Sequence, residues 1–271
     1  MKQHDKPLAL PIQKIITESE RVKTFVFDYD FPGEPGQFVM CWIPGFDEKP
    51  FGLIKKDGEG FRLAVAAVGD STKAMHMMEV GELLGFRGPY GSTFMLPEKP
   101  GSIALVGGGY GIAPLSYLAQ VARKKGHNVH LFIGARTKEE LLYVDWMKEV
   151  GVKLHVATDD GSEGYKGFNT DLFAEYVQKN RIDYVYTVGP EIMELKIAGV
   201  CWEKKIPFEA SLERYMKCGF GICGQCSVDP TGWRMCVEGP VIDGEKLREI
   251  DEFGKYHRTA SGKIEKYPWV K

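Results

Sequence analysis

The first hundred residues contain short runs of β-branched and aromatic residues, separated by Gly, Pro and Asp. Such runs are typical of short strands, and strands joined by these turn residues predict a small antiparallel β-barrel. One short helix is expected within residues 71–80, where the sequence TKAMHMMEV interrupts the strands. The expected strands cover residues 12–16, 22–28, 37–42, 61–67 and 83–87.

The pattern changes after Pro97 and Pro100, where strand-like and helix-like segments begin to alternate. This alternation predicts a parallel sheet whose strands are connected by crossover helices. From Phe208 onward the chain is rich in glycine and cysteine, so we expect a small third unit that is organised by its ligands. The strand-like segments cover residues 102–107, 129–135, 153–160 and 183–190, and the helix-like segments cover residues 114–126, 138–151, 170–180 and 193–204.

A length of 271 residues is enough for two or three units that each close a core. The predicted fold is therefore multi-domain. It has an N-terminal antiparallel β-barrel in residues 1–98, a central α/β parallel-sheet domain in residues 99–208, and a small cysteine-rich domain with a C-terminal tail in residues 209–271. The 37 acidic and 35 basic residues nearly cancel, and no run of like charge indicates a nucleic-acid partner.

Residues 102–122 carry no charge and have about the length that spans a bilayer. Three consecutive glycines, a fourth at Gly111, and Pro114 would break such a helix, whereas a buried strand, a glycine turn and a helix explain the whole stretch. The N-terminus lacks the apolar core and small-residue cleavage site of a secretory signal. We therefore expect a cytoplasmic protein that does not enter a membrane.

Four of the six cysteines, Cys218, Cys223, Cys226 and Cys236, lie close together near the C-terminal end. In a cytoplasmic protein, clustered thiols indicate a metal or redox centre rather than disulfides. Their spacing of four, two and nine intervening residues matches plant-type [2Fe-2S] ligation. The glycines between the first three cysteines tolerate the unusual dihedrals with which a backbone points N–H groups at sulfurs.

Three other kinds of site also use clustered thiols and are alternatives here. A structural zinc site usually has two C-x-x-C knuckles, and only Cys223 and Cys226 form one here. A thioredoxin-like pair would leave Cys218 and Cys236 without a role, and a Rieske centre needs two histidine ligands, which the segment between those two cysteines lacks. The remaining cysteines, expected to be buried small hydrophobic residues, are Cys41 and Cys201.

Residues 105–114 have the pattern of a strand, a glycine turn and the start of a helix, with Pro114 near the first helical position. This context points free N–H groups and the positive end of a helix dipole at an anion. It predicts a nucleotide-binding turn, with a plain packing turn as the alternative. The glycines of this turn are Gly107, Gly108, Gly109 and Gly111.

An iron–sulfur cluster transfers single electrons and a nicotinamide transfers a hydride, so a chain that uses both needs a flavin to convert between them. The N-terminal unit offers two candidate segments. Residues 49–52 carry a cation that could face a diphosphate, and residues 69–72 supply hydroxyls and amides at the start of the inserted helix. Taken singly, either segment could also be an ordinary turn.

The order of these motifs, a barrel, then GGGYGIAP, then CGFGICGQC with a later cysteine, resembles the ferredoxin-reductase superfamily. Within it, the chain is most similar to the electron-transfer subunit of the two-subunit, NAD-linked dihydroorotate dehydrogenase. The resemblance covers essentially the whole chain. It implies an oxidoreductase component that binds FAD and a [2Fe-2S] cluster and uses NAD as a substrate, and the choice of NAD over NADP rests on it alone.

By the same resemblance, residues 49–52 take the place of the Arg-Pro-aromatic-Ser flavin motif of the family. Lys49 keeps the charge of that arginine but loses its bidentate fork, Gly52 lacks the hydroxyl, and Val188 stands where the family has a thiol beside the nicotinamide. The flavin-contacting positions implied are Lys49, Pro50, Phe51, Gly52, Ala64, Val65, Ala66, Ser71 and Thr72, and those implied near the nicotinamide are Gly189 and Pro190.

The resemblance further implies a partner: an FMN-containing catalytic subunit that oxidises dihydroorotate to orotate in pyrimidine biosynthesis, assembled with this chain as a heterotetramer. No substrate-oxidising catalytic residue is then expected here. The alternatives are an equivalent FAD and [2Fe-2S] reductase subunit of a sulfhydrogenase, a sulfite reductase or a ferredoxin:NADP oxidoreductase. A function of a different class would be a zinc-stabilised nucleotide-binding regulator without redox activity.

Overall fold

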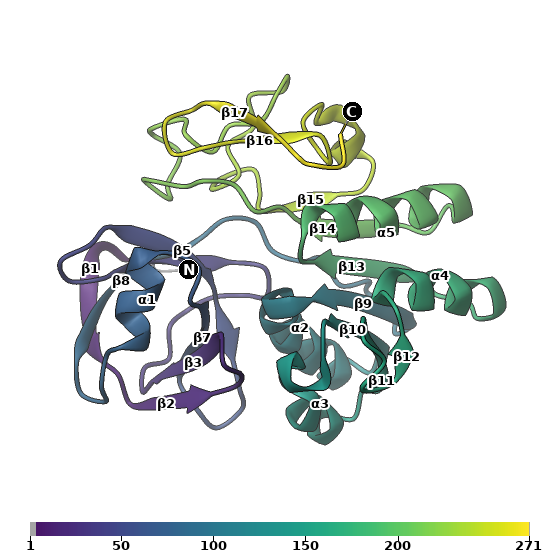
Figure 1. Ribbon diagram of the computed structural model, residues 1–271, viewed down its shortest axis with the longest axis horizontal. Helices are drawn as coiled ribbons and strands as arrows, with labels where there is room; N and C mark the ends of the chain where they lie inside the picture. The colour runs from purple at the N-terminus through teal and green to yellow at the C-terminus, as the bar shows by residue number, and fades with distance from the viewer. Residues whose placement is uncertain (1–3, 271) are drawn as a thin grey trace.

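The computed structural model describes residues 4–270. Figure 1 shows three parts: antiparallel strands of the N-terminal hundred residues on the left, a parallel sheet flanked by helices on the right, and a loop-rich segment with a C-terminal hairpin above both. None of the helices between residues 4 and 270 is long and apolar enough to cross a bilayer.

The N-terminal strands form two four-stranded antiparallel sheets, with the orders β1-β8-β4-β5 and β2-β3-β7-β6. Their antiparallel pairing confirms the sequence prediction. The first sheet contains β1 (His4–Pro11), β8 (Leu83–Tyr90), β4 (Phe38–Trp42) and β5 (Glu48–Gly52), and the second contains β2 (Lys14–Thr17), β3 (Val22–Phe27), β7 (Phe61–Ala66) and β6 (Ile54–Lys55).

The predicted barrel is therefore found as two sheets, and the described ladders do not close into one cylinder. The chain passes from one sheet to the other at residues 12 and 13. The Ile12 N–H donates to the Glu82 carbonyl on the first sheet's side, and the next N–H, of Gln13, donates to Val26 of β3. Two successive residues thus pair with different sheets. The chain turns a corner at this point instead of continuing as one strand of a closed barrel.

Aromatic residues fill the space between the two sheets. The ring of Phe27 lies 4.9 Å from that of Phe61 and 4.7 Å from that of Phe86, and all three side chains are fully buried. The predicted helix is shorter than expected: α1 spans Asp70–His76. Its last residue bonds through Nε2 to the Val65 carbonyl at 2.8 Å, which fixes the helix end against β7.

The central unit is a seven-stranded sheet with the order β12-β11-β10-β9-β13-β14-β15. All neighbouring pairs are parallel except β14 with β15. This confirms the predicted parallel sheet. Its strands are β9 (Ser102–Gly108), β10 (Asn128–Ala135), β11 (Lys153–Thr158), β12 (Tyr165–Lys166), β13 (Tyr184–Val188), β14 (Phe208–Ser211) and β15 (Val241–Asp243).

Helices cover both faces of this sheet (Figure 1). Buried residues of β9 alternate between the two sides: Ile103 and Leu105 pack in the core that includes α2, and Ala104 and Val106 pack in the core that includes α4 and α5. A strand such as β9, whose successive side chains are buried on opposite faces of the sheet, is typical of parallel sheets that are covered by helices on both sides. The helices are α2 (Ile112–Lys124), α3 (Val144–Val150), α4 (Asn169–Lys179) and α5 (Glu191–Lys204).

One predicted helix is broken. Residues 138–151 form a 3₁₀ turn, η2 (Lys138–Glu140), and then α3, with Tyr143 in the left-handed region at φ 59° between them. The Tyr143 hydroxyl lies 2.7 Å from the Thr24 hydroxyl of the N-terminal unit, and its ring is buried. This long-range contact holds the tyrosine where a continuous helix would not place it.

The cysteine-rich segment leaves the sheet after β14 and returns at β15. Between those strands the described chain has only an isolated bridge between Ser227 and Arg234, which agrees with the predicted lack of periodicity. Ser211 pairs with Val241 where the segment begins and ends. The tail that follows contains a 3₁₀ turn and a hairpin, η3 (Lys246–Glu249), β16 (Tyr256–Arg258) and β17 (Ile264–Lys266).

Candidate functional site

The four clustered cysteines lie in two pairs on the loop between β14 and β15. The thiol of Cys218 interacts with that of Cys223, the thiol of Cys226 interacts with that of Cys236, and Cys218 also interacts electrostatically with the second pair. Among residues 4–270, no three His, Cys, Asp or Glu side chains are grouped as a site for one ion. Because plant-type ligation gives each of two irons a pair of thiolates, the paired arrangement fits a [2Fe-2S] cluster.

Backbone N–H groups surround the first thiol, as the glycine-rich spacing predicts. Burial raises the pKa of Cys218, but the N–H groups of Cys223 and Phe220 outweigh it and lower that pKa to about 6. The hydrogen bond with Cys236, opposed by burial, lowers the pKa of Cys226 to about 7 and raises the pKa of Cys236. Since the thiolate is the form that binds metal, the N–H groups around Cys218 favour ligation there.

The glycines between these cysteines have the backbone conformations that other residues avoid. Gly219, Gly221 and Gly224 have φ values of 80°, 85° and 69°, in the left-handed region where a Cβ is costly. A Cβ on Gly219 would also lie 2.5 Å from Cγ of Met40. The loop therefore approaches the N-terminal sheets too closely for a side chain at this position.

The two outlying cysteines are buried in the cores of the protein. Cys41 and Cys201 have no exposed surface, and burial raises the pKa of both thiols, that of Cys201 to about 12. Both are therefore neutral packing residues, as the sequence predicts.

A cavity of about 560 Å³ lies between the N-terminal sheets, the start of α2 and the residues after β14. Most of the predicted flavin positions line it. Val65 does not, because it alternates with its neighbours along β7 and its side chain is buried in the N-terminal core. The predicted positions on this cavity are Lys49, Pro50, Phe51, Gly52, Ala64, Ala66, Ser71, Thr72 and Gly111.

The polar groups of this cavity form a connected set. Asp47 lies just outside and accepts a hydrogen bond from Lys49 at 2.6 Å and another from the Ser71 hydroxyl at 3.0 Å. The Thr72 hydroxyl accepts the Gly69 N–H at 3.0 Å at the start of α1. A cation, hydroxyl and amide donors together suit a diphosphate, the group that the sequence offers for Lys49 with an ordinary turn as the alternative.

A second cavity, of about 530 Å³, lies at the carboxyl ends of β9 and β10, where ligands bind to parallel sheets. It contains Gly108, Gly109 and Pro190 from the predicted set. The two cavities adjoin, because Ala66, Val68 and Tyr110 line both. A dinucleotide in the second cavity can therefore reach a ring in the first.

The glycine turn brings two strands of the sheet together at this junction. A Cβ on Gly111 would lie 2.3 Å from the carbonyl oxygen of Val188, directly before Gly189. The Asn169 amide donates to the Gly107 carbonyl at 2.9 Å, so α4 closes the other side of the turn. These predicted glycines shape the cavity through close backbone approach.

Several residues of the two cavities were not predicted. Tyr110 shares a hydrogen bond with Glu213, and the charge of Glu213, together with burial, raises the pKa of Tyr110 to about 12. The only sequence signal for Glu213 is its position just after β14, ahead of the first clustered cysteine. The other unpredicted lining residues include Arg214 and Met216 in the first cavity and Arg21, Arg136, Phe168, Asn169 and Lys196 in the second.

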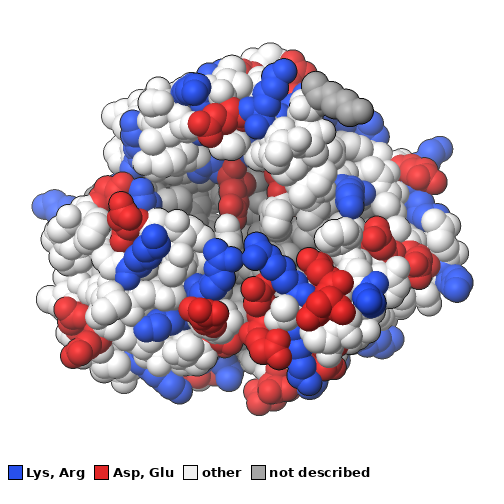
Figure 2. All heavy atoms as spheres, viewed as in Figure 1, with Lys and Arg blue, Asp and Glu red and all other residues white. Residues whose placement is uncertain are grey.

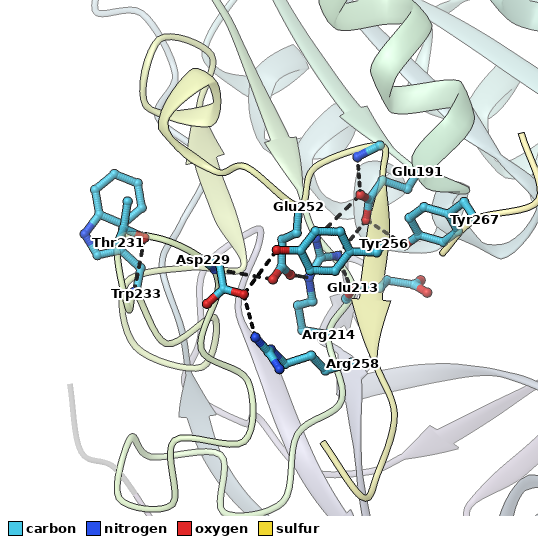
Figure 3. Close-up of polar contacts among 11 residues, drawn as sticks. Glu191, Glu213, Arg214, Asp229, Thr231, Trp233, Glu252, Tyr256, Arg258 and Tyr267 are labelled. Atoms are coloured by element: carbon cyan, nitrogen blue, oxygen red, sulfur yellow. Dashed lines mark hydrogen bonds and ion pairs between the residues drawn. The ribbon is translucent and has the colours of Figure 1, made fainter. Parts of the chain in front are cut away.

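Arg214 joins the cysteine segment, the tail and α5 (Figure 3). Its side chain is 3% exposed and donates to Glu252 at 2.5 Å and to Glu191 at 2.6 Å. Glu191 also accepts the Tyr267 hydroxyl at 2.9 Å. Because Glu191 is the first residue of α5, this network fixes the tail and the residues before Cys218 to the helix beside the second cavity.

The surface around the cavities carries both signs of charge. Figure 2 shows a hollow between the upper segment and the two lower units, with acidic side chains inside it and Lys and Arg along its lower rim. Arg21 and Lys196 are among the cations that line the second cavity. Such cations suit the phosphates of a nucleotide.

The adjoining cavities and the paired thiols, on this fold, are features of an electron-transferring oxidoreductase of the ferredoxin-reductase type. The chain is similar over 89% of its length, with a TM-score of 0.80 and 33% identity, to 89% of a chain in the structure of the NADH-dependent reduced ferredoxin-NADP oxidoreductase. Ferredoxin reductase of carbazole 1,9a-dioxygenase, at 19% identity and a TM-score of 0.63 over 74% of this chain and 66% of that one, shares the fold.

Family models match two parts of the chain: an oxidoreductase NAD-binding domain at residues 105–198 and the iron–sulfur cluster binding domain of dihydroorotate dehydrogenase B at residues 213–248. The probable dihydroorotate dehydrogenase B (NAD(+)) electron transfer subunit of Methanocaldococcus jannaschii is 48% identical over 96% of this chain and 98% of its own. The subunit of the same name from Methanothermobacter thermautotrophicus is 43% identical over 97% and 98%. The chain belongs to the family of dihydroorotate dehydrogenase B electron transfer subunits.

Proposed function

We propose that this chain carries electrons between a partner that oxidises dihydroorotate and NAD, through a [2Fe-2S] cluster and FAD. The observation that carries the proposal is the shared wall of the two cavities at Tyr110, with the cysteine loop resting on the same N-terminal sheets. Bound FAD would exchange single electrons with the cluster and a hydride with the nicotinamide.

The residues have separate tasks in this proposal. Lys49, Ser71 and the start of α1 hold the flavin diphosphate, and residues 50–52 and Ala64 line the ring. The turn at residues 107–111, with Gly189 and Pro190, holds the dinucleotide and brings its nicotinamide to the ring. Cys218, Cys223, Cys226 and Cys236 hold the cluster.

Three departures from the family motifs are compatible with this geometry. A Cβ on Gly52 would meet Pro114 at an ordinary 3.5 Å, so the missing hydroxyl leaves space rather than a distortion. Lys49 supplies one charged donor in place of a fork. Val188 keeps the close approach to Gly111 without a thiol.

The chain would then comprise a flavin unit in residues 1–98, a nucleotide unit in residues 99–208 and a cluster unit in residues 209–271. The two N-terminal sheets together form the flavin unit. Strands β14 and β15 belong to the nucleotide sheet by hydrogen bonding, so the cluster unit is attached through that sheet.

The partner would be an FMN-containing catalytic subunit, joined with this chain in a cytoplasmic heterotetramer. Purified alone, the chain should then oxidise NADH with an artificial acceptor and leave dihydroorotate unchanged. Adding the catalytic subunit should couple dihydroorotate oxidation to NAD reduction. Turnover of dihydroorotate by the isolated chain would contradict the assignment as a subunit.

A second candidate is a reductase subunit of a ferredoxin:NADP oxidoreductase, which the similarity to the NADH-dependent enzyme favours. Affinity purification of the intact complex, followed by mass spectrometry, separates the two candidates by the subunit that co-purifies. An absorption spectrum tests the remaining class: flavin and iron–sulfur bands support an electron carrier, and a colourless protein with bound zinc supports a regulator.

A further inference from the structure

Arg87 lies at the contact between the flavin unit and the cysteine loop. It is a residue of β8 with 9% of its surface exposed, and every nitrogen of its guanidinium has a partner. Nη2 donates to the Cys218 carbonyl at 3.1 Å, Nε donates to Glu48 at 2.8 Å, and Nη1 donates to the Tyr90 hydroxyl at 3.2 Å. Only a planar fork of donors can make these three contacts at once.

The aromatic and apolar neighbours of Arg87 hold the same part of the loop. The guanidinium lies 5.5 Å from the centre of the Phe220 ring, within the range of a cation–π contact. Between Cys218 and Phe220, Gly219 is packed against Met40. Residues 218–220 are therefore seated on β4 and β8 by a hydrogen bond, a ring contact and close packing.

The strand register connects the positions that contact residues 218–220 to the predicted flavin motif. Arg87 of β8 pairs with Met40 of β4, and Met40 pairs in turn with Pro50 of β5. Pro50 lines the flavin cavity. A ligand of the cluster and the flavin motif are thus fixed to neighbouring strands of one sheet, with Arg87 as the polar link.

Arg87 also brings charge to the cluster loop. Its guanidinium is charged at any physiological pH, and it forms an ion pair with Glu48. One-electron reduction adds negative charge at the cluster, which a nearby cation stabilises and a nearby carboxylate opposes. The two members of this pair should therefore act on the cluster potential with opposite signs.

We infer that Arg87 is a positioning residue that holds the Cys218 end of the cysteine loop on the β1-β8-β4-β5 sheet. Its charge, balanced by that of Glu48, also tunes the reduction potential of the cluster. The inference rests on the proposed function. It assigns to this chain a link between its two electron carriers that neither the cysteine spacing nor the glycine turn contains.

The test is a redox titration of the whole chain with its cofactors, followed by the paramagnetic signal of the reduced cluster. Arg87→Gln should shift the reduction equilibrium of the cluster roughly tenfold toward the oxidised form, which is about 59 mV for a one-electron couple. Glu48→Gln should shift it in the opposite direction. Arg87→Lys should keep most of the potential, because it keeps the charge.

A rate measurement separates the effect of Arg87 on the position of the cysteine loop from the effect of its charge on the cluster potential. After rapid mixing with NADH, the cluster should be reduced about tenfold more slowly in both Arg87→Lys and Arg87→Gln, because neither side chain can hold the Cys218 carbonyl, Glu48 and Tyr90 together. Arg62→Gln is the matched control. Arg62 also pairs with a glutamate, Glu59, and is equally buried, but it does not touch the loop, so the potential and the rate should stay at wild-type values.

The outcomes are distinguishable. A wild-type chain without a reducible cluster would overturn the proposed function itself. A wild-type cluster whose potential and rate of reduction are unchanged in Arg87→Gln would overturn only the role of Arg87. If Arg87→Gln fails to assemble a cluster, Glu48→Gln decides: a raised potential supports the inference, and an unchanged one contradicts it.

Discussion

The nucleotide sheet and the cysteine segment fix their ligand-binding groups in different ways. In the sheet, the turn at Gly107–Gly111 is held by strand register and by backbone contacts such as that of Gly111 with Val188. In the segment between β14 and β15, an isolated bridge is the only described strand pairing, and side chains such as Arg87 and Arg214 provide the anchors. The sheet therefore holds its site by strand register and backbone contacts, whereas the segment holds its cysteines by side-chain contacts, including the packing of Met216, Val228 and Met235 in the core that it shares with the sheet.

The largest expected effect tests the dependence of the segment on its thiols. Changing any one of Cys218, Cys223, Cys226 and Cys236 to Ser should abolish the paramagnetic signal of the reduced cluster, because one of the two irons then loses half of its thiolate pair. Flavin content should stay unchanged, since none of the four cysteines lines the flavin cavity. Cys201→Ala is the control and should keep the full signal; a Ser variant of a clustered cysteine with a normal signal would remove that residue from the ligand set.

The next effect concerns the anchor that joins the two regions. Arg214→Met should lower the free energy of unfolding by about 3–5 kcal/mol, because it leaves Glu191 and Glu252 buried without their cation. Denaturation in urea, followed by fluorescence, measures this change. Arg181→Met removes an exposed pair with Asp183 and should cost less than about 1 kcal/mol; equal costs for the two variants would mean that the Arg214 network is not an anchor.

The sheet should show its own pH dependence through Glu209 on β14. Burial raises the pKa of Glu209 to about 7, although its carboxylate accepts the Met95 N–H at 3.0 Å. The folded protein therefore holds a proton that the unfolded chain releases above its ordinary pKa of 4.5. Stability from this group is present at low pH and is lost as the pH rises to about 7, by up to about 3 kcal/mol.

Glu209→Gln should remove that dependence, because the amide oxygen can still accept the Met95 N–H and carries no charge. Urea denaturation at pH 5 and pH 8 compares the two proteins. The variant should be relatively more stable at the higher pH. A wild-type protein and variant that differ equally at both values would show that Glu209 ionises normally in the fold.

The smallest effect tests whether the sheet unit tolerates change away from its turn. Gly199 lies inside α5, where a Cβ would meet nothing within 4 Å, so Gly199→Ala should raise the free energy of unfolding by about 1 kcal/mol. Gly111→Ala is the opposite case, because its Cβ would lie 2.3 Å from a backbone oxygen. That variant should be destabilised and should bind NADH more weakly; calorimetry measures both quantities.

The same contrast explains what the sequence could predict. The alternation of strands and helices predicts the parallel sheet because each strand is a local apolar run, and residues 102–107 match β9 almost end to end. Residues 48–52 carry a proline and a glycine, yet they form β5 because pairing with β4 overrides local propensity. The break at Tyr143 also depends on a distant partner, Thr24.

The residues of the candidate site likewise fall into two groups, those marked by a local sequence pattern and those brought together only by the fold. Spacing alone selects the four cysteines and the glycine turn, since those patterns are local. The contact of Arg87 with Cys218 joins residues 131 positions apart, and Arg214 reaches Glu191 and Glu252 in two other segments. No local pattern marks such partners, because their roles arise only when the chain brings them together.

The pairing of Ser211 with Val241 has a consequence for how such chains can diversify. The chain leaves the sheet after β14 and returns to it in the neighbouring strand β15, so residues 212–240 form a loop between two adjacent strands. The length of this loop places no strain on the two strands that it joins. An exchange of this stretch between homologues would leave the hydrogen-bond ladder of the sheet intact. Its two ends are splice points for building hybrid electron carriers with a different metal centre on the same nucleotide-binding frame, provided that the incoming stretch keeps the ion pairs of Arg214 and a carbonyl for Arg87.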